Sequence, residues 1–367
     1  MFSISVFLLN VLVMIYELLI LYIISFSYFF KITRRNKLEI IMDRDFFLVP
    51  LFLLLSLIMG FRAISVGVDT LNYYHTFMQI SKMNFEDLLI GFTYDDAEIG
   101  YVIFIKLISM LFDDYFAFQI ITSFLFCFFM IFFIRENAIN YITSSVVFIA
   151  LLYLLSFNIS RQMLAVSMLA YGWCLYAKKK YKGAFLISLL SVSFHYSAVF
   201  FVVVYFVYYL RNNKFFVDLF PLLMLIFVIL FDIVMSFVEK YFVYYSDYYG
   251  NTRDIQNANM SKYLWLLEFL MSLYIIYKNK VFDAYHKYIA MISMMSSVVN
   301  YISLSFNYFE RIGLYLYPFL ILLFDIFGLG FKNKYICSFY YFSVCVCFLF
   351  LFFKSTKATQ YIYSFFF

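Results

Sequence analysis

Three arginines of the sequence stand at the ends of long apolar runs: Arg62, Arg161 and Arg311. An arginine at membrane depth costs at least about 2.5–3.5 kcal/mol on insertion scales, so it usually has a partner. Each could pair with a nearby acid or extend to the lipid headgroups. A guanidinium group is also planar and offers paired donors that match phosphate oxygens. Three on one face would therefore predict an anionic site, with a lipid pyrophosphate as the obvious candidate.

Two acids and one histidine accompany these arginines. Asp69 follows the first of them by seven residues, and Glu98 opens an apolar segment, where its carboxylate could simply complement a helix N-terminus. His195 interrupts the apolar run 184–210. An imidazole there could be a hydrogen-bonded packing residue, or it could be the general base, or an orienting group, for a hydroxyl nucleophile. His195 and Asp69 are the candidate bases, and we prefer His195.

The composition determines the kind of element that must hold these residues. Of 367 residues, 66% are hydrophobic and 25% aromatic, while only 13% are charged, about half the usual share of a soluble domain. A soluble domain of this length could not bury so much apolar surface, which excludes a soluble enzyme and a disulfide-stapled secreted module. With 10 Gly, 3 Pro and continuous apolar runs, long helices are expected rather than a barrel. The sequence predicts an all-α integral membrane protein.

The basic residues predict which side of the membrane each helix end faces. Clusters such as 31–44 and 178–182 should lie in the cytoplasm. One threading places every cluster there, provided that 99–112 lies at the outer face and 184–210 forms a re-entrant hairpin. We therefore expect one polytopic domain over 1–367, a bundle of roughly ten transmembrane helices plus the hairpin, with an external, uncleaved N-terminus. Its main external loops are 62–114 and 238–262, and the three arginines share the outer face.

The ordered motifs resemble a known family. They are Arg62-x4-Gly67-Val68-Asp69-Thr70-x2-Tyr73, Glu98-Ile99-Gly100-Tyr101, Ser160-Arg161-Gln162-Met163, Ser193-Phe194-His195-Tyr196-Ser197 and Glu310-Arg311-Ile312-Gly313-Leu314-Tyr315. This set looks like the EpsG-like branch of the Wzy-type repeat-unit polymerases, which build bacterial O-antigens, capsules and exopolysaccharides. The match runs from about Arg62 to the end of the chain. The family typically shows a Gly-Thr-Asp-like triplet, where this chain has Gly67-Val68-Asp69.

The resemblance implies a metal-independent membrane glycosyltransferase with a GT-C-like architecture. Its substrates would be undecaprenyl-pyrophosphate-linked oligosaccharides at the periplasmic face of the bacterial inner membrane, with no cofactor and no nucleic acid. A chain-length regulator protein is a further partner that the resemblance suggests. The implied site residues are His195, Asp69 and Glu98 for catalysis, Arg62, Arg161 and Arg311 for pyrophosphate, and Tyr73, Gln162 and Tyr315 for substrate.

Other classes of membrane protein fit less well. A lipid-oligosaccharide flippase or transporter usually shows repeated halves with matching Gly or Pro breaks, and neither is seen here. An O-antigen ligase uses the same lipid donor, and only the resemblance separates it from a polymerase. A purely structural membrane subunit would not need the three outer arginines.

Overall fold

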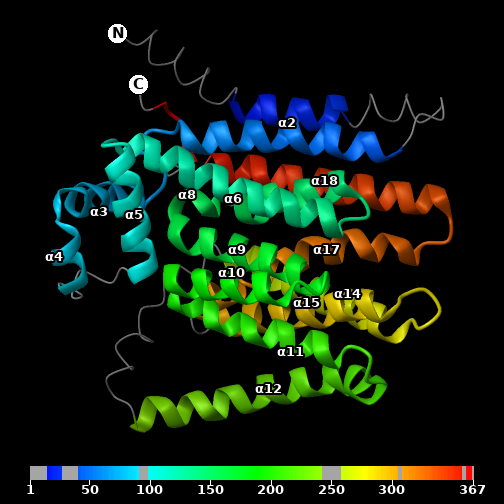
Figure 1. The fold of residues 1–367 in the computed structure, drawn as a ribbon. Helices are drawn as coiled ribbons and strands as arrows, with labels where there is room; N and C mark the ends of the chain where they lie inside the picture. The colour runs from blue at the N-terminus through cyan, green and yellow to red at the C-terminus, as the bar shows by residue number, and fades with distance from the viewer. Residues whose placement is uncertain are drawn as a thin grey trace. The chain divides into compact units, whose positions relative to one another are not determined.

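A computed structural model describes residues 15–26, 40–90, 98–241, 258–304, 308–357 and 361–365 (Figure 1). Within these residues every regular element is a helix, and the one β-type contact is an isolated bridge between Arg62 and Phe365. Four helices are long and apolar enough to cross a membrane: Tyr115–Asn137, Tyr141–Asn158, Lys214–Phe231 and Lys334–Thr356. Shorter apolar helices accompany them. The all-helical, multi-pass membrane character is thus confirmed, whereas ten crossings and a GT-C-like architecture stay predictions.

The chain divides into two compact units. Unit 1 comprises residues 1–198 and 341–367, and unit 2 comprises 199–340. The expected single membrane domain stays a prediction. The helices of unit 1 are Ile15–Phe26, α2 (Ile40–Gly60), α3 (Thr70–Lys82), α4 (Phe85–Ile90), α5 (Ile99–Leu111), α6 (Tyr115–Asn137), α7 (Tyr141–Phe148), α8 (Leu155–Asn158), α9 (Ser160–Ala177), α10 (Tyr181–Phe194) and part of α18 (Lys334–Thr356).

Helix α9 is the most deeply buried helix that bears a predicted site residue. Unit 1 packs α6 between α2 and α9, and α9 also packs against α10 (Figure 1). Small residues such as Ala165, Ala170 and Gly172 are buried on α9, which allows neighbouring helices to approach closely. The Ser191 hydroxyl of α10 donates a 2.9 Å hydrogen bond to the carbonyl of Ala165. This packing holds α9 against α6 and α10.

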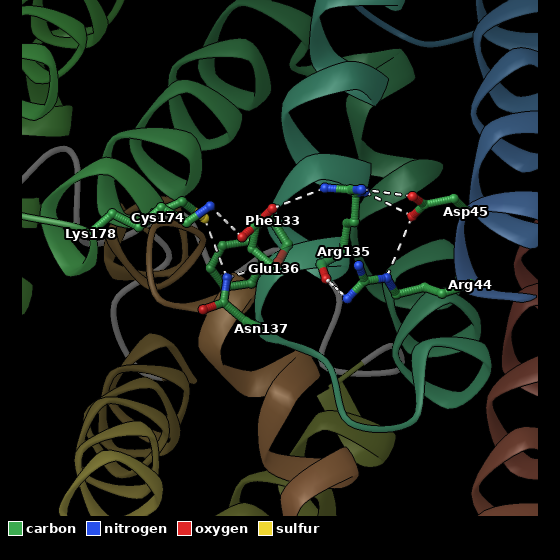
Figure 2. A network of polar contacts seen from close by, with 8 residues as sticks. All are labelled: Arg44, Asp45, Phe133, Arg135, Glu136, Asn137, Cys174 and Lys178. Atoms are coloured by element: carbon green, nitrogen blue, oxygen red, sulfur yellow. Dashed lines mark hydrogen bonds and ion pairs between the residues drawn. The ribbon is translucent and has the colours of Figure 1, made fainter. Parts of the chain in front are cut away.

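One end of α2, α6 and α9 is joined by an ion-pair network (Figure 2). Arg135 donates to both carboxylate oxygens of Asp45, at 2.8 and 2.7 Å, and Arg44 donates to the Arg135 carbonyl at 2.8 Å. Glu136 contacts both Arg135 and Lys178. Arg44 and Lys178 belong to two of the basic clusters that the sequence places in the cytoplasm. The structure brings these two clusters to the same end of unit 1, in agreement with that expectation.

The opposite end of the same three helices leads to the predicted outer segment. Helix α9 has 18 residues, about 27 Å of rise, so its first and last turns are well separated. Within the segment 62–114, the expected helix 99–112 is present as α5, whose 13 residues rise only about 20 Å and fall short of the hydrocarbon thickness. Helix α5 is therefore too short to span the membrane in a straight path. This length agrees with its interpretation as an outer-face helix.

The expected break in the run 184–210 is confirmed. Helix α10 ends at Phe194, His195 is extended with ψ 113°, and a 3₁₀ turn over Tyr196–Phe201 precedes α11 (Val202–Leu210). The two sides of the break belong to different units. The re-entrant hairpin itself stays a prediction.

Unit 2 is arranged around α15. Helix α15 packs against α11, α12, α14, α16 and α17. The elements are α11, α12 (Lys214–Tyr241), α14 (Ala258–Tyr277), α15 (Ala284–Ser303), α16 (Tyr308–Gly313), α17 (Tyr317–Phe327) and the first residues of α18. Asp283 and His286 form a reciprocal cap at the start of α15. Most of the predicted external loop 238–262 lies outside the described residues, which resume at 258.

Candidate functional site

Glu98 joins two of the predicted site residues. The residue is 5% exposed. Its Oε1 lies 2.7 Å from Nδ1 of His195 and accepts a 3.1 Å hydrogen bond from the Tyr196 amide. Its Oε2 lies 2.9 Å from Nη1 of Arg161, an ion pair without the alignment of a hydrogen bond. One carboxylate therefore connects the start of α5, the first turn of α9 and the break after α10.

The charges of this group determine the tautomer of the histidine. Burial raises the pKa of Glu98, but the hydrogen bond with His195 and the charge of Arg161 outweigh it, so the pKa lies below its usual value. The carboxylate is then ionised at neutral pH and can only accept hydrogen bonds. Nδ1 of His195 must carry a proton, so in the neutral imidazole the lone pair is on Nε2.

Gly100 explains why Glu98 can reach His195. A Cβ atom at position 100 would lie 2.1 Å from Oγ of Ser193 and 2.7 Å from its carbonyl oxygen. Only glycine lets α5 touch the last turn of α10 at this point. Glu98 lies two residues before Gly100, and His195 lies two residues after Ser193. The contact between Gly100 and Ser193 therefore brings Glu98 close to His195. Glu98 does occupy the N-cap position of α5, but its side chain makes no capping hydrogen bond, so simple capping does not account for it.

Replacement of Gly100 by alanine is expected to disrupt this junction, because the added methyl group would collide with backbone and side-chain atoms of Ser193. We expect a clear fall in the thermal unfolding temperature of the purified protein and loss of activity. Gly183→Ala is the matched control, since its Cβ would meet only the flexible end of Leu175 at 3.3 Å. Equal unfolding temperatures for the two variants would contradict the role assigned to Gly100.

Arg161 is the second residue of α9, where a positive charge opposes the helix dipole. Glu98 compensates that charge, and the guanidinium also lies over the ring of Tyr101, 5.7 Å from its centre. The Arg161 side chain keeps 22% of its surface exposed. Tyr73 of α3 lies beside Arg161, and its ring meets Tyr101 edge-on at 6.3 Å. Arg161 is thus held in place but not enclosed.

The loop that carries Asp69 is fixed to the turn before Arg161. Gly67 has φ +98°, and a Cβ there would lie 2.6 Å from the carbonyl oxygen of Phe157. The amide of Val68 donates to Oδ1 of Asn158 at 2.9 Å. The hydroxyl of Thr70 donates to the Val66 carbonyl at 2.7 Å and also lies 3.2 Å from the Phe157 carbonyl oxygen. Asp69 then occupies the N-cap position of α3 with its side chain partly exposed and making no cap bond.

Arg62 is enclosed near the same turn. It is 2% exposed, donates from Nη1 to the carbonyl of Met59, and lies 5.0 Å from the centre of the Phe157 ring. Within the described residues its Nε has no hydrogen-bond partner, and no carboxylate lies within ion-pair distance. The amide of Ala63 donates to the Ser364 carbonyl, so the segment 361–365 runs alongside. A buried positive charge without a counter-ion is costly, so a bound anion would stabilise it.

The remaining predicted residues are placed as follows. Gln162 is 3% exposed, next to Arg161 on α9. Arg311 is exposed on α16, and Tyr315 is 1% exposed just after it. Both belong to unit 2, whereas the other predicted site residues belong to unit 1. Within the described residues, no group of three His, Cys, Asp or Glu side chains is arranged to hold a metal ion.

Comparison with known proteins decides the family. The model of the EpsG family matches residues 45–367. The chain belongs to the EpsG family. The matched region includes every predicted site residue, and the membership indicates a membrane enzyme of polysaccharide metabolism. No curated protein and no solved structure matches this EpsG family member.

Sequence reasoning did not assign the residues that fix this site in the EpsG chain. Tyr101, which lies under the Arg161 guanidinium, and Asn158, which binds the Val68 amide, are two of these. Asn158 also donates to the hydroxyl of Tyr361 at 2.8 Å. Their signal in the sequence was limited to position: Tyr101 ends the recognised motif Glu98-Ile99-Gly100-Tyr101, and Asn158 lies three residues before Arg161.

Proposed function

We propose that this EpsG family member is a membrane glycosyltransferase that polymerises undecaprenyl-pyrophosphate-linked oligosaccharide repeat units at the outer face of the bacterial inner membrane. The growing chain on one lipid is transferred to the non-reducing-end sugar of a repeat unit on another, and undecaprenyl pyrophosphate leaves. The observation that carries the proposal is the contact of Glu98 with both His195 and Arg161. A base and an anion-binding group at one place are what this transfer requires.

The acceptor hydroxyl is activated by His195. Its Nδ1–H is directed to Glu98, so Nε2 takes the proton as the hydroxyl oxygen forms its bond to the anomeric carbon of the donor sugar. Glu98 holds the ring in this tautomer and stabilises the imidazolium that forms. Asp69 is the second candidate base, because it lies partly exposed at the start of α3.

The pyrophosphate leaving group is stabilised by guanidinium charge. As the bond between the anomeric carbon and the pyrophosphate oxygen breaks, negative charge develops on that oxygen, and fixed donors favour the transition state over the ground state. Arg161 is partly exposed and held by Glu98. Arg62, which has no carboxylate partner in the described residues, and Arg311 of unit 2 are proposed to add to this charge. Tyr73, Gln162 and Tyr315 are proposed to contact the substrate.

The deciding experiment is a reconstitution. Full-length protein in liposomes, given one defined undecaprenyl-pyrophosphate-linked repeat and a chelator, should yield a ladder of lengthened oligosaccharides and free undecaprenyl pyrophosphate. Ladder formation only after addition of a divalent ion would overturn the metal-independent mechanism. Movement of the intact lipid between leaflets without lengthening would favour a flippase. Transfer only to a lipid A–core acceptor would favour a ligase.

A further inference from the structure

Helices α14 and α15 of unit 2 pack against each other, and each carries buried polar side chains. Glu268 and Ser272 are one turn apart on α14, and Ser293 and Ser296 lie on one face of α15. All four side chains are fully buried, and each has an oxygen with no hydrogen-bond partner among the described residues. An ionisable side chain within apolar helices is costly, so it marks a candidate functional position.

Glu268 is connected to α15 and α17 through an amide. Asn300 donates from Nδ2 to Oε2 of Glu268 at 3.5 Å, and the Tyr317 hydroxyl donates to Oδ1 of Asn300 at 3.1 Å. We refer to Glu268, Asn300 and Tyr317 as the Glu268 cluster. Across the described part of the chain, no basic side chain lies within 4.0 Å of the Glu268 carboxyl group. An ionised carboxylate without a counter-charge would be strongly disfavoured here, which favours the protonated acid.

The Glu268 cluster also contacts the helix that bears Arg311. Helix α16 packs against α15, and a Cβ at Gly313 would lie 3.3 Å from Oδ1 of Asn300 and 3.2 Å from the Val299 side chain. The amide oxygen that accepts from Tyr317 therefore also abuts the end of α16, two residues after Arg311. Movement of Asn300 would displace both the end of α16 and the start of α17.

We propose that Glu268 is a positioning residue, a neutral carboxylic acid that fixes Asn300 and, through it, the orientation of α16 and Arg311. The role of Arg311 rests on the proposed function, whereas the neutral state of Glu268 does not. A neutral acid suits this place because its carbonyl oxygen accepts from Asn300 without the cost of a buried charge. Because Glu268 is fully buried, it is not assigned a direct part in the reaction.

The protonation of Glu268 can be tested by dicyclohexylcarbodiimide, which enters apolar regions and reacts with protonated carboxyl groups. The acid adds across one C=N bond: its oxygen bonds to the central carbon and its proton moves to nitrogen. The acyl group then shifts to nitrogen, giving a stable N-acylurea with no leaving group. In full-length protein in membranes, peptide mass spectrometry should show this adduct on Glu268.

Asp283, at the start of α15, is the internal control. Its side chain is 67% exposed, so it should react instead with a water-soluble carbodiimide and an added amine. Labelling of Glu268 by the water-soluble reagent only, or by neither reagent, would overturn the neutral buried acid. These experiments need no polymerase activity, so they remain decisive if the proposed function fails.

The positioning role is tested by substitution in the reconstituted system. Glu268→Gln keeps a neutral acceptor and should retain kcat/KM within about twofold, whereas Glu268→Leu and Asn300→Leu should each lower it by about tenfold or more. The double variant should lose no more than either single one, because both changes break the same contact. The glutamine variant keeps the size of the side chain and serves as the control for misfolding. The unfolding temperature of each purified variant shows whether it is folded.

Three outcomes would overturn the positioning role. If Glu268→Leu matches the wild type, the cluster does not position the site. If Glu268→Gln is as impaired as Glu268→Leu, an ionised carboxylate acts instead. If the wild type requires Na⁺ and Glu268→Gln removes that requirement, the group is a cation site. Absence of polymer from the wild type would count against the proposed function alone, and the labelling would still judge the state of Glu268.

Discussion

His195→Ala is expected to lower kcat of the polymerisation by about 10²–10⁴-fold, the usual contribution of a positioned base. The acceptor hydroxyl must lose its proton as the glycosidic bond forms. The Glu98 carboxylate holds the proton of His195 on Nδ1, so Nε2 is the nitrogen that can accept the proton of the hydroxyl. KM for the lipid-linked repeat should change little, because the imidazole contributes to the transition state rather than to ground-state binding. Initial rates over a range of repeat concentrations separate the two constants.

Two further variants make this prediction specific. Glu98→Gln keeps the size of the side chain but removes the charge that orients the ring and stabilises the imidazolium, so it should reduce kcat as well. His75→Ala is the control, since His75 is an exposed histidine on α3 of the same outer segment. In cells, His195→Ala should leave single repeats that still reach the final acceptor. A wild-type distribution of chain lengths in that variant would exclude His195 as the base.

The helical part of the fold could be predicted because apolar runs must satisfy their backbone within helices. Even irregular features followed: the break at His195 and the short helix α5 are both where the charges and polar residues indicated. The sequence also predicts that the basic clusters share one side, and Arg44 and Lys178 do lie at one end of unit 1, whereas the side of the membrane that this end faces stays a prediction. These features depend on local composition, which a single sequence contains.

The contacts within the site could not be predicted, because they join residues far apart in the chain. Glu98 and His195 are 97 residues apart, and nothing local indicates that one carboxylate serves both His195 and Arg161. Gly100 belongs to a recognised motif, yet its role depends on the approach of Ser193 from another helix. Glu268 received no assignment from the sequence, because one acid within an apolar run gives no indication of its partners.

The burial of Arg62 could not be predicted from the sequence either. Its position at the end of an apolar run suggested an accessible anion site, and the structure encloses it at 2% exposure against Phe157. Its lack of a carboxylate partner in the described residues keeps it a candidate for pyrophosphate, but an anion would reach it only if neighbouring segments moved. Arg161, which is partly exposed and held by Glu98, is therefore the sharper test of the anion site.

Arg161→Ala is expected to lower kcat by about 10²–10³-fold, as loss of one fixed donor to a developing anion typically does. Arg161→Lys should recover only part of this loss, because an ammonium group keeps the charge without the paired donors that match phosphate. Exposed Lys182, at the other end of unit 1, provides the control Lys182→Ala, which should behave as the wild type.

A structural role of Arg161 must be separated from its role toward the substrate, because its removal leaves the buried Glu98 with less compensation. The double variant Arg161→Ala/Glu98→Gln removes that uncompensated charge. It should recover the unfolding temperature of the wild type and yet have a kcat well below that of Glu98→Gln alone, since no guanidinium is left to meet the leaving group. A double variant as stable as the wild type and as active as Glu98→Gln alone would show that Arg161 only neutralises Glu98, and the pyrophosphate site would have to be sought elsewhere.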